Sequence, residues 1–204
     1  LAQPYAEWSG EIHREGMLLG YLPQELPPEA RELTAYEFCC QSPGFLDSSP
    51  KEQARAAAQL GFSPDLFYAD RQMRTFSGGE KVKLQLGLLT LARPDCCLLD
   101  EPSNDLDIET LEWLERFIRE SQAPVLFISH DEALLENTAN VILHMEQLRR
   151  KTLPRHTVAR MGYRQYVEER FQKFAHQEQL ARKEREEERK QQERFQKIQQ
   201  KVEH

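Results

Sequence analysis

Phe76-Ser77-Gly78-Gly79-Glu80 opens the stretch that decides the fold, and two short apolar runs follow it. The first run, Cys96-Cys97-Leu98-Leu99, leads into Asp100-Glu101-Pro102 and then Asn104-Asp105-Leu106-Asp107, and the second, Val125-Leu126-Phe127-Ile128, leads into Ser129-His130. Short apolar runs bounded by turn residues are typical of buried parallel strands, whose polar residues gather at the carboxyl ends. The stretch therefore predicts an α/β fold with Asp100, Glu101 and His130 at one edge of a sheet.

These three blocks resemble the signature, the Walker B motif with its D-loop, and the switch histidine of ABC ATPases. The resemblance implies an ABC-type P-loop NTPase module that binds ATP and Mg²⁺. A further apolar run, residues 17–22, leads to Gln24, which resembles the Q-loop glutamine of this family. Residues 26–75 then resemble the helical subdomain, with helices predicted over 29–39 and 50–60.

The resemblance also implies roles for individual residues. Asp100 would hold Mg²⁺ through a water molecule, with Gln24 sensing the ion. Glu101 would act as general base or would position the attacking water, and His130 would bond the γ-phosphate. The signature offers a hydroxyl and unobstructed N–H groups at a helix start, which is a place for an anion. The predicted nucleotide contacts are Gln24, Ser77, Gly78, Gly79, Glu80, Asn104 and Asp107, and in this family the signature contacts the nucleotide of the opposing module.

A phosphate-binding G-x-x-x-x-G-K-[ST] loop is absent from the sequence, since no glycine is followed by Lys-Ser or Lys-Thr. Residues 9–12 and 20–24 resemble the segment that comes shortly after the P-loop helix in the family. We therefore interpret the chain as a fragment that begins after the Walker A segment. On this interpretation the chain alone does not hydrolyse ATP.

The last forty or so residues differ in composition from the rest of the chain. They are rich in Glu, Lys, Arg and Gln and contain no Gly or Pro after Gly162. They predict one long charged helix, whose apolar seam suggests coiled-coil packing at its two ends. The seam consists of Val167, Phe171, Phe174, Phe195, Ile198 and Val202. We expect residues 1–161 to form most of a first ABC module and residues 162–204 to form the first helix of an interdomain linker.

The D-loop and the tail together resemble the ABC-F family, in which two ABC modules in one chain are joined by a long helical linker. Gly162-Tyr163 followed by Tyr166 is where such a linker begins. Asp105 departs from the family, because most members have histidine there. The resemblance implies a cytoplasmic protein whose partners are a second module of the same chain and the ribosome, with its rRNA and exit-site tRNA. Such proteins act in translation or in antibiotic resistance.

Two other classes of protein share parts of this pattern. The nucleotide-binding subunit of a membrane transporter would have the same catalytic residues, but it would not explain the charged terminal helix. A chromosome or repair ATPase of the SMC type has its coiled coil between Walker A and signature, whereas here the charged helix follows His130. The net charge of −7 argues against a nucleic-acid binder that works through a bulk positive field. No apolar run approaches the length of a membrane span.

Overall fold

The computed structural model describes residues 11, 13, 16–146 and 155–202, with the side chains of Glu146, Arg155 and the end of the last helix left out. The contacts divide the chain into two compact units, Leu1–Leu134 and Leu135–His204. The resemblance of residues 9–12 to the segment after a P-loop helix falls almost wholly outside the described residues.

In the described part of the first unit, a parallel sheet of three strands organises the fold. Its strands are β1 (Leu19–Leu22), β2 (Cys96–Asp100) and β3 (Val125–Ile128), in the order β1-β2-β3. All three predicted strands are confirmed, and β1 is two residues shorter than expected. Because the strands are parallel, Gln24, Asp100 and His130 follow strand ends at the same edge of the sheet.

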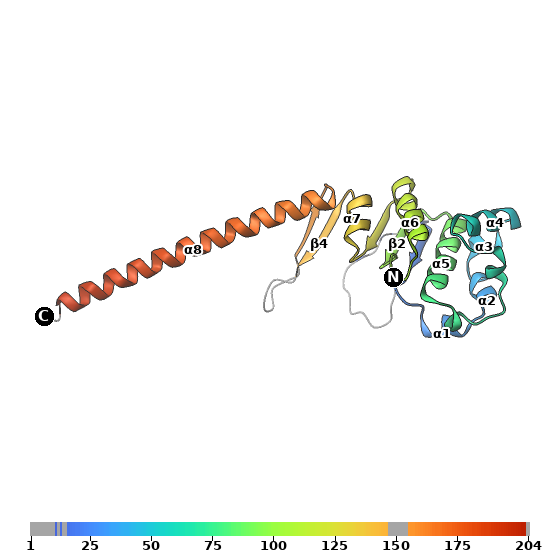
Figure 1. The fold of residues 1–204 in the computed structure, drawn as a ribbon, viewed down its shortest axis with the longest axis horizontal. Coiled ribbons are helices and arrows are strands. Elements are labelled where there is room, and N and C mark those ends of the chain that lie inside the picture. Colours follow the sequence, from blue (N-terminus) through green and yellow to red (C-terminus); the bar gives the residue numbers. More distant parts are fainter. Residues whose placement is uncertain (1–10, 12, 14–15, 147–154, 203–204) are drawn as a thin grey trace. The chain divides into compact units, whose positions relative to one another are not determined.

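Helices fill the sequence between β1 and β2 and gather on one side of the first unit (Figure 1). They are α1 (Pro28–Glu32), α2 (Ala35–Cys39), α3 (Pro43–Leu46), α4 (Pro50–Gln59), the 3-10 turns Pro64–Tyr68 and Met73–Thr75, and α5 (Gly78–Ala92). Residues 26–75, predicted to form a helical subdomain, are thus mainly helical, and α5 begins at the predicted signature. Helix α4 ends as predicted, with Gly61 in the left-handed region at φ 68°.

The helix predicted over residues 29–39 is wrong, because the structure has two short helices there. Leu33 and Thr34 are extended, and Thr34 is the N-cap of α2, where its hydroxyl accepts a hydrogen bond from the N–H of Glu37. Thr34 also forms an isolated antiparallel bridge with Gln72, ahead of the signature. A capping box and a long-range backbone pairing together outweigh the continuous helical propensity of the segment.

Two apolar cores flank α5. Leu84 and Leu88 of α5 pack into a core formed by the helical subdomain, around Phe67 and Met73. Leu86 and Leu89 pack into a second core with the sheet and with α6 (Ile108–Glu120). The middle of α5 is therefore buried from both sides.

Helix α6 begins at the predicted N-cap, Asp107, and its buried stripe differs slightly from the predicted one. Leu114 is fully buried and Ile118 packs against the core, as predicted, whereas Leu111 is not part of the core. Trp113 is buried and stacks on Phe117 at 5.1 Å between ring centroids. Trp113 therefore packs in the core, as expected.

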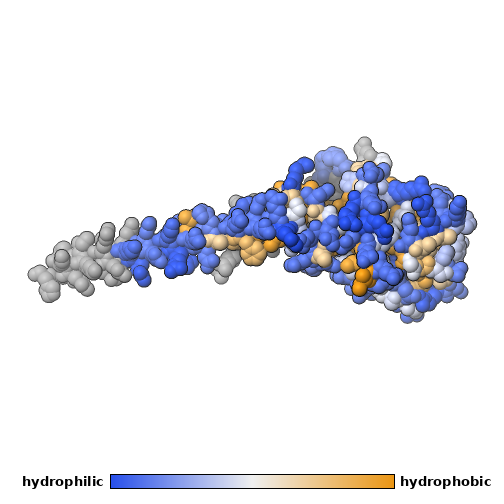
Figure 2. Space-filling view, turned by 45° about the horizontal axis from the view of Figure 1, so that its top comes forward, coloured by the Kyte–Doolittle hydropathy of each residue, from blue (hydrophilic) through white to orange (hydrophobic). Residues whose placement is uncertain are grey.

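The second unit contains most of α7 (Glu132–Thr138), an antiparallel pair of strands and the long helix α8. The strands are β4 (Ile142–Glu146) and β5 (Arg155–Ala159), and α8 runs over Tyr163–Val202. The predicted long charged helix is confirmed, and Figure 2 shows the coloured part of its surface to be mainly hydrophilic. Phe171 and Phe174 are exposed on α8, and the side chains of Phe195, Ile198 and Val202 lie outside the described residues.

Candidate functional site

A cavity of about 340 Å³ lies at the carboxyl edge of the parallel sheet. It is lined by Gln24 from the loop after β1, by Asp100 and Glu101 at the end of β2, and by Gly78 of the signature. Burial raises the pKa of the Tyr21 hydroxyl on the neighbouring strand β1, and the negative charge of Asp100 raises that pKa further. The sheet therefore brings a carboxylate pair and an amide together beside the first turn of α5.

Glu101 is the buried acid of this edge, with 8% of its surface exposed. Its N–H donates to the carbonyl of Ile128 at 2.9 Å, so that the residue is tied to the end of β3. Its carboxylate accepts a hydrogen bond from the N–H of His130 at 3.1 Å, and the imidazole Nε2 of His130 lies 3.3 Å from the second oxygen. The two residues predicted to be catalytic therefore contact one another directly.

The signature forms the N-cap of α5. The Ser77 hydroxyl accepts a hydrogen bond from the N–H of Glu80 at 3.2 Å, and the Glu80 carboxylate accepts one from the N–H of Ser77 at 2.8 Å. This bond to Ser77, together with the Arg71 guanidinium, holds the pKa of Glu80 below its usual range. The capping box occupies the N–H groups of Ser77 and Glu80, so that those of Gly78 and Gly79 are the donors left at the helix start.

The D-loop packs directly on the two glycines of the signature. A Cβ on Gly78 would collide with the Asp105 carboxylate, and a Cβ on Gly79 would lie 2.7 Å from the Asp105 carbonyl oxygen. Asp105 itself has φ 61°, in the left-handed region that non-glycine residues rarely adopt. Glycine is therefore required at position 79, where the D-loop backbone approaches this closely, whereas at Gly78 a Cβ would displace the Asp105 side chain.

Asp107 lies in a different setting from Asp100 and Glu101. One of its oxygens accepts hydrogen bonds from the N–H and hydroxyl of Thr110, at 2.8 and 2.6 Å. The other lies 2.6 Å from Nζ of Lys83 on α5. The Lys83 ammonium and then the Thr110 groups lower the pKa of Asp107 to about 2. The carboxylate thus caps α6 and joins it to α5.

The cavity suits a magnesium ion that is bound mainly through phosphate oxygens. Gln24 and Asp100 supply two oxygen donors at its wall. Magnesium in such sites uses one or two carboxylates and completes its shell with water and substrate phosphates. Within the described residues, no group of three or more His, Cys, Asp or Glu side chains could hold a metal ion. The donor set fits an ion delivered with a nucleotide.

The structure therefore separates the predicted site residues into three groups. Gln24, Gly78, Asp100, Glu101 and Asn104 line the cavity, and His130 joins them through Glu101. Ser77, Gly79 and Glu80 form the signature turn, and Asp107 lies between α5 and α6.

Sequence reasoning missed Arg71, Lys81 and Lys83. Lys81 lines the cavity, Lys83 binds Asp107 and Arg71 binds Glu80. Only their positive charge close to the signature could have indicated them.

The family profile described as "ABC transporter" matches residues 3–104. The chain belongs to the ABC family. This match spans Gln24, the helical subdomain, the signature and the Walker B residues, which are the parts that surround the cavity. None of the helices in the described part of this ABC protein combines the length and the apolar character that a bilayer crossing needs.

The relatives that this ABC protein matches include several F-family members. It is 41% identical over 101 residues to ABC transporter F family member 5 of Arabidopsis thaliana, a match that covers 50% of this chain and 14% of the relative. It is 39% identical over 129 residues to a probable ATP-binding cassette sub-family F member 3 homolog of Encephalitozoon cuniculi, covering 63% of this chain and 22% of the relative. Human sub-family F member 3 is 37% identical over 103 residues, 50% of this chain and 14% of its own length. The matches thus cover less than a quarter of each relative.

Solved structures agree with the fold. A protein described as RNase-L Inhibitor has a TM-score of 0.57 and 26% identity, over 77% of this chain and 30% of its own length. An archaeal ribosome recycling factor, aABCE1, solved with the archaeal ribosomal stalk protein aP1, has a TM-score of 0.56 and 26% identity over the same shares. The ATP-binding subunit of an ABC transporter, at 23% identity and a TM-score of 0.50, shares the fold.

Proposed function

We propose that this chain forms part of an F-family ABC ATPase, which binds and hydrolyses ATP with Mg²⁺ and switches conformation on the ribosome in the cytoplasm. The observation that carries the proposal is the buried Glu101 carboxylate, held by His130 beside a cavity that contains Gln24 and Asp100. The F-family names of the relatives support the ABC-F assignment. The ribosomal partners in the titles of solved relatives support the ribosome as the site of action.

The chemistry proposed for this edge needs one base, one orienting donor and two metal ligands. Glu101 positions a water molecule and accepts its proton, and its low exposure keeps competing solvent away. His130 fixes the Glu101 carboxylate through its backbone N–H. Its imidazole lies against the second Glu101 oxygen but is exposed to solvent, so it can turn toward a phosphate oxygen when a nucleotide binds. Asp100 and Gln24 would hold a Mg²⁺ ion, which would supply positive charge against the charge that develops on the phosphate.

The signature turn serves a second nucleotide. The N–H groups of Gly78 and Gly79 stand at the positive end of α5, and the Ser77 hydroxyl lies beside them. We propose that this turn contacts the phosphate of ATP held by a second module of the same protein, with Asn104 and Asp107 in the loop that couples the two sites. Residues 162–204, which include α8, would be the linker that reaches toward tRNA. Such a linker is compatible with a role in translation control and with a role in antibiotic protection.

Steady-state ATP hydrolysis by the full-length protein, with and without ribosomes, tests the proposal. We expect ribosomes to stimulate hydrolysis and Glu101→Gln to lower kcat by about 100-fold or more, because the amide keeps the shape but loses the base. Gln59→Glu at the exposed end of α4, outside the cavity lining, is a control for a change of charge. If Glu101→Gln hydrolyses ATP at the wild-type rate, Glu101 has no role in catalysis. If ribosomes do not change the rate of hydrolysis, a transporter subunit is favoured.

A further inference from the structure

Arg71 contacts the signature turn at two points. Its guanidinium carbon lies 3.7 Å from the centroid of the Phe76 ring, and its Nη2 lies 2.8 Å from Oε1 of Glu80. The Phe76 ring is only 4% exposed, so it is a fixed platform for the guanidinium. The Arg71 side chain therefore bridges the residue before the turn and the residue after the two glycines.

The backbone of Arg71 is itself fixed by the segment between α1 and α2. The carbonyl of Arg71 accepts a hydrogen bond from the N–H of Ala35 at 3.0 Å, and the N–H of Met73 donates to Leu33 at 2.8 Å. These bonds flank the Thr34–Gln72 bridge. Since α1 follows the loop of Gln24, a continuous chain of contacts runs from that loop through Arg71 to the signature.

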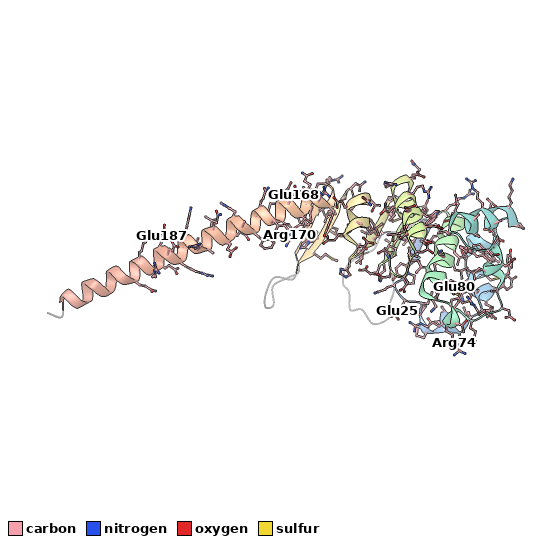
Figure 3. All side chains as sticks on the ribbon, viewed as in Figure 1. Glu25, Arg74, Glu80, Glu168, Arg170 and Glu187 are labelled. Carbon is pink, nitrogen blue, oxygen red and sulfur yellow. The ribbon has the colours of Figure 1, made fainter. Side chains whose placement is uncertain are left out.

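The negative charge of Glu80 makes its contact with Arg71 important for binding an anion at the signature turn. Glu80 lies in the first turn of α5, where the helix dipole and two glycine N–H groups favour an anion. A carboxylate there competes with a phosphate and repels it. The Arg71 guanidinium binds one oxygen of Glu80 while the N–H of Ser77 binds the other, so the charge is compensated on both sides. In Figure 3 Glu80 lies at the same end of the first unit as Arg74 and Glu25.

A capping box alone does not explain this arrangement, because the helical subdomain contains two others. Thr34 and Glu37 form the box of α2, and Ser49 and Glu52 form the box of α4. Glu52 also binds an arginine, Arg93, at 3.1 Å. In the described residues, the box of α5 alone has its arginine stacked on an aromatic ring. Arg93 thus provides a matched control for Arg71.

We propose that Arg71 is a positioning residue of the signature turn. Through Phe76 and Glu80 it fixes the orientation of the Ser77 hydroxyl and of the glycine N–H groups, and it compensates the Glu80 charge that would repel a phosphate. The inference rests on the proposed function in one respect, which is that the anion is the phosphate of ATP. Arg71 itself does not touch the reacting atoms.

Hydrogen exchange in the nucleotide-free full-length protein tests the positioning directly. In Arg71→Gln the amides of Ser77 and Glu80 should exchange about fivefold faster, because the carboxylate loses its second partner. Arg71→Lys keeps the charge without the flat guanidinium and should restore part of the protection. In the control Arg93→Gln, the amides of residues 77–80 should keep the wild-type rate. Unchanged exchange at residues 77–80 in Arg71→Gln overturns the proposal.

Kinetics of the same variants distinguish positioning from a general loss of stability. Arg71→Gln should lower kcat about tenfold while the KM for ATP stays within about twofold, since the turn acts after the nucleotide has bound. Phe76→Leu made in the Arg71→Gln background should add little, because the two residues form one unit. An unchanged kcat in Arg71→Gln overturns the proposal. Absence of ATP hydrolysis in the wild-type protein overturns the proposed function instead. In that case the hydrogen-exchange rates of residues 77–80 decide the role of Arg71.

Discussion

The carboxylates of Glu101 and Asp107, which follow β2, differ in their surroundings, and this difference indicates different roles for them. Glu101 is buried, faces His130 and has φ 48°, a backbone conformation that costs a non-glycine residue about 1 kcal/mol. Such strain gathers at functional sites. Asp107 has its two oxygens bound by Thr110 and Lys83, so it also has a structural role that can be measured through stability.

Asp107 should make the stability of the chain depend on pH in the acid range. The pKa of its carboxyl is lowered from 3.8 to about 2 in the folded chain, so its contribution is fully present above pH 3.8 and is lost as the pH falls toward about 2. The side chain is 56% exposed, and solvent screening reduces the contribution to about 1 kcal/mol. Urea unfolding of the chain at a series of pH values, from about 5 down to about 2, measures this contribution.

Two substitutions separate the cap from the ion pair. Asp107→Asn keeps the N-cap of α6 and loses the charge. The pH-dependent part of the free energy of unfolding should therefore disappear, while the helix cap remains. Asp107→Ala loses both and should destabilise the chain by about 1 to 2 kcal/mol at neutral pH. An Asp107→Asn variant with the same pH dependence as the wild type would contradict the assignment.

At the scale of elements, apolar runs and caps predict most of the fold. β2 and β3 follow from their Cys, Leu, Val and Ile runs, and Asp107 marks the start of α6. The break between α1 and α2 is not predictable in this way, because it depends on Thr34 pairing with Gln72, which is far away in the sequence. The site shows the same limit: the motif residues at the strand ends are predictable, whereas Arg71 and Lys83 depend on tertiary proximity.

Packing of α3 on α5 depends on Gly44. A Cβ at this position would lie 2.7 Å from the backbone nitrogen of Ala92, and backbone cannot move aside as a side chain does. Gly44→Ala should therefore destabilise the chain by about 1 to 3 kcal/mol, measured as a lower urea midpoint. Gly162→Ala, where the nearest atom is 4.0 Å away, is the control. Equal midpoints for Gly44→Ala and wild type would show that α3 does not pack closely on α5.

At the scale of the whole molecule, the chain spans 14 to 22% of its F-family relatives from Arabidopsis, Encephalitozoon and human. It contains a segment matched to the ABC family, with Gln24 and the carboxylates of Asp100 and Glu101 proposed as its Q-loop and Walker B residues, and a long charged helix after it. An ABC ATPase that works on ribosomes must couple closure on ATP to binding of the ribosome. Blocking hydrolysis should therefore trap the protein on its partner.

Co-sedimentation with ribosomes is the measurement that tests this account most directly. The full-length protein is prepared with Glu101→Gln and the matching change in the proposed second module, and is centrifuged with ribosomes in ATP or in ADP. We predict that the variant sediments with ribosomes in ATP and stays in the supernatant in ADP, since the closed state forms but its ATP is not hydrolysed. Absence of the variant from the ribosome pellet in both nucleotides would contradict the account.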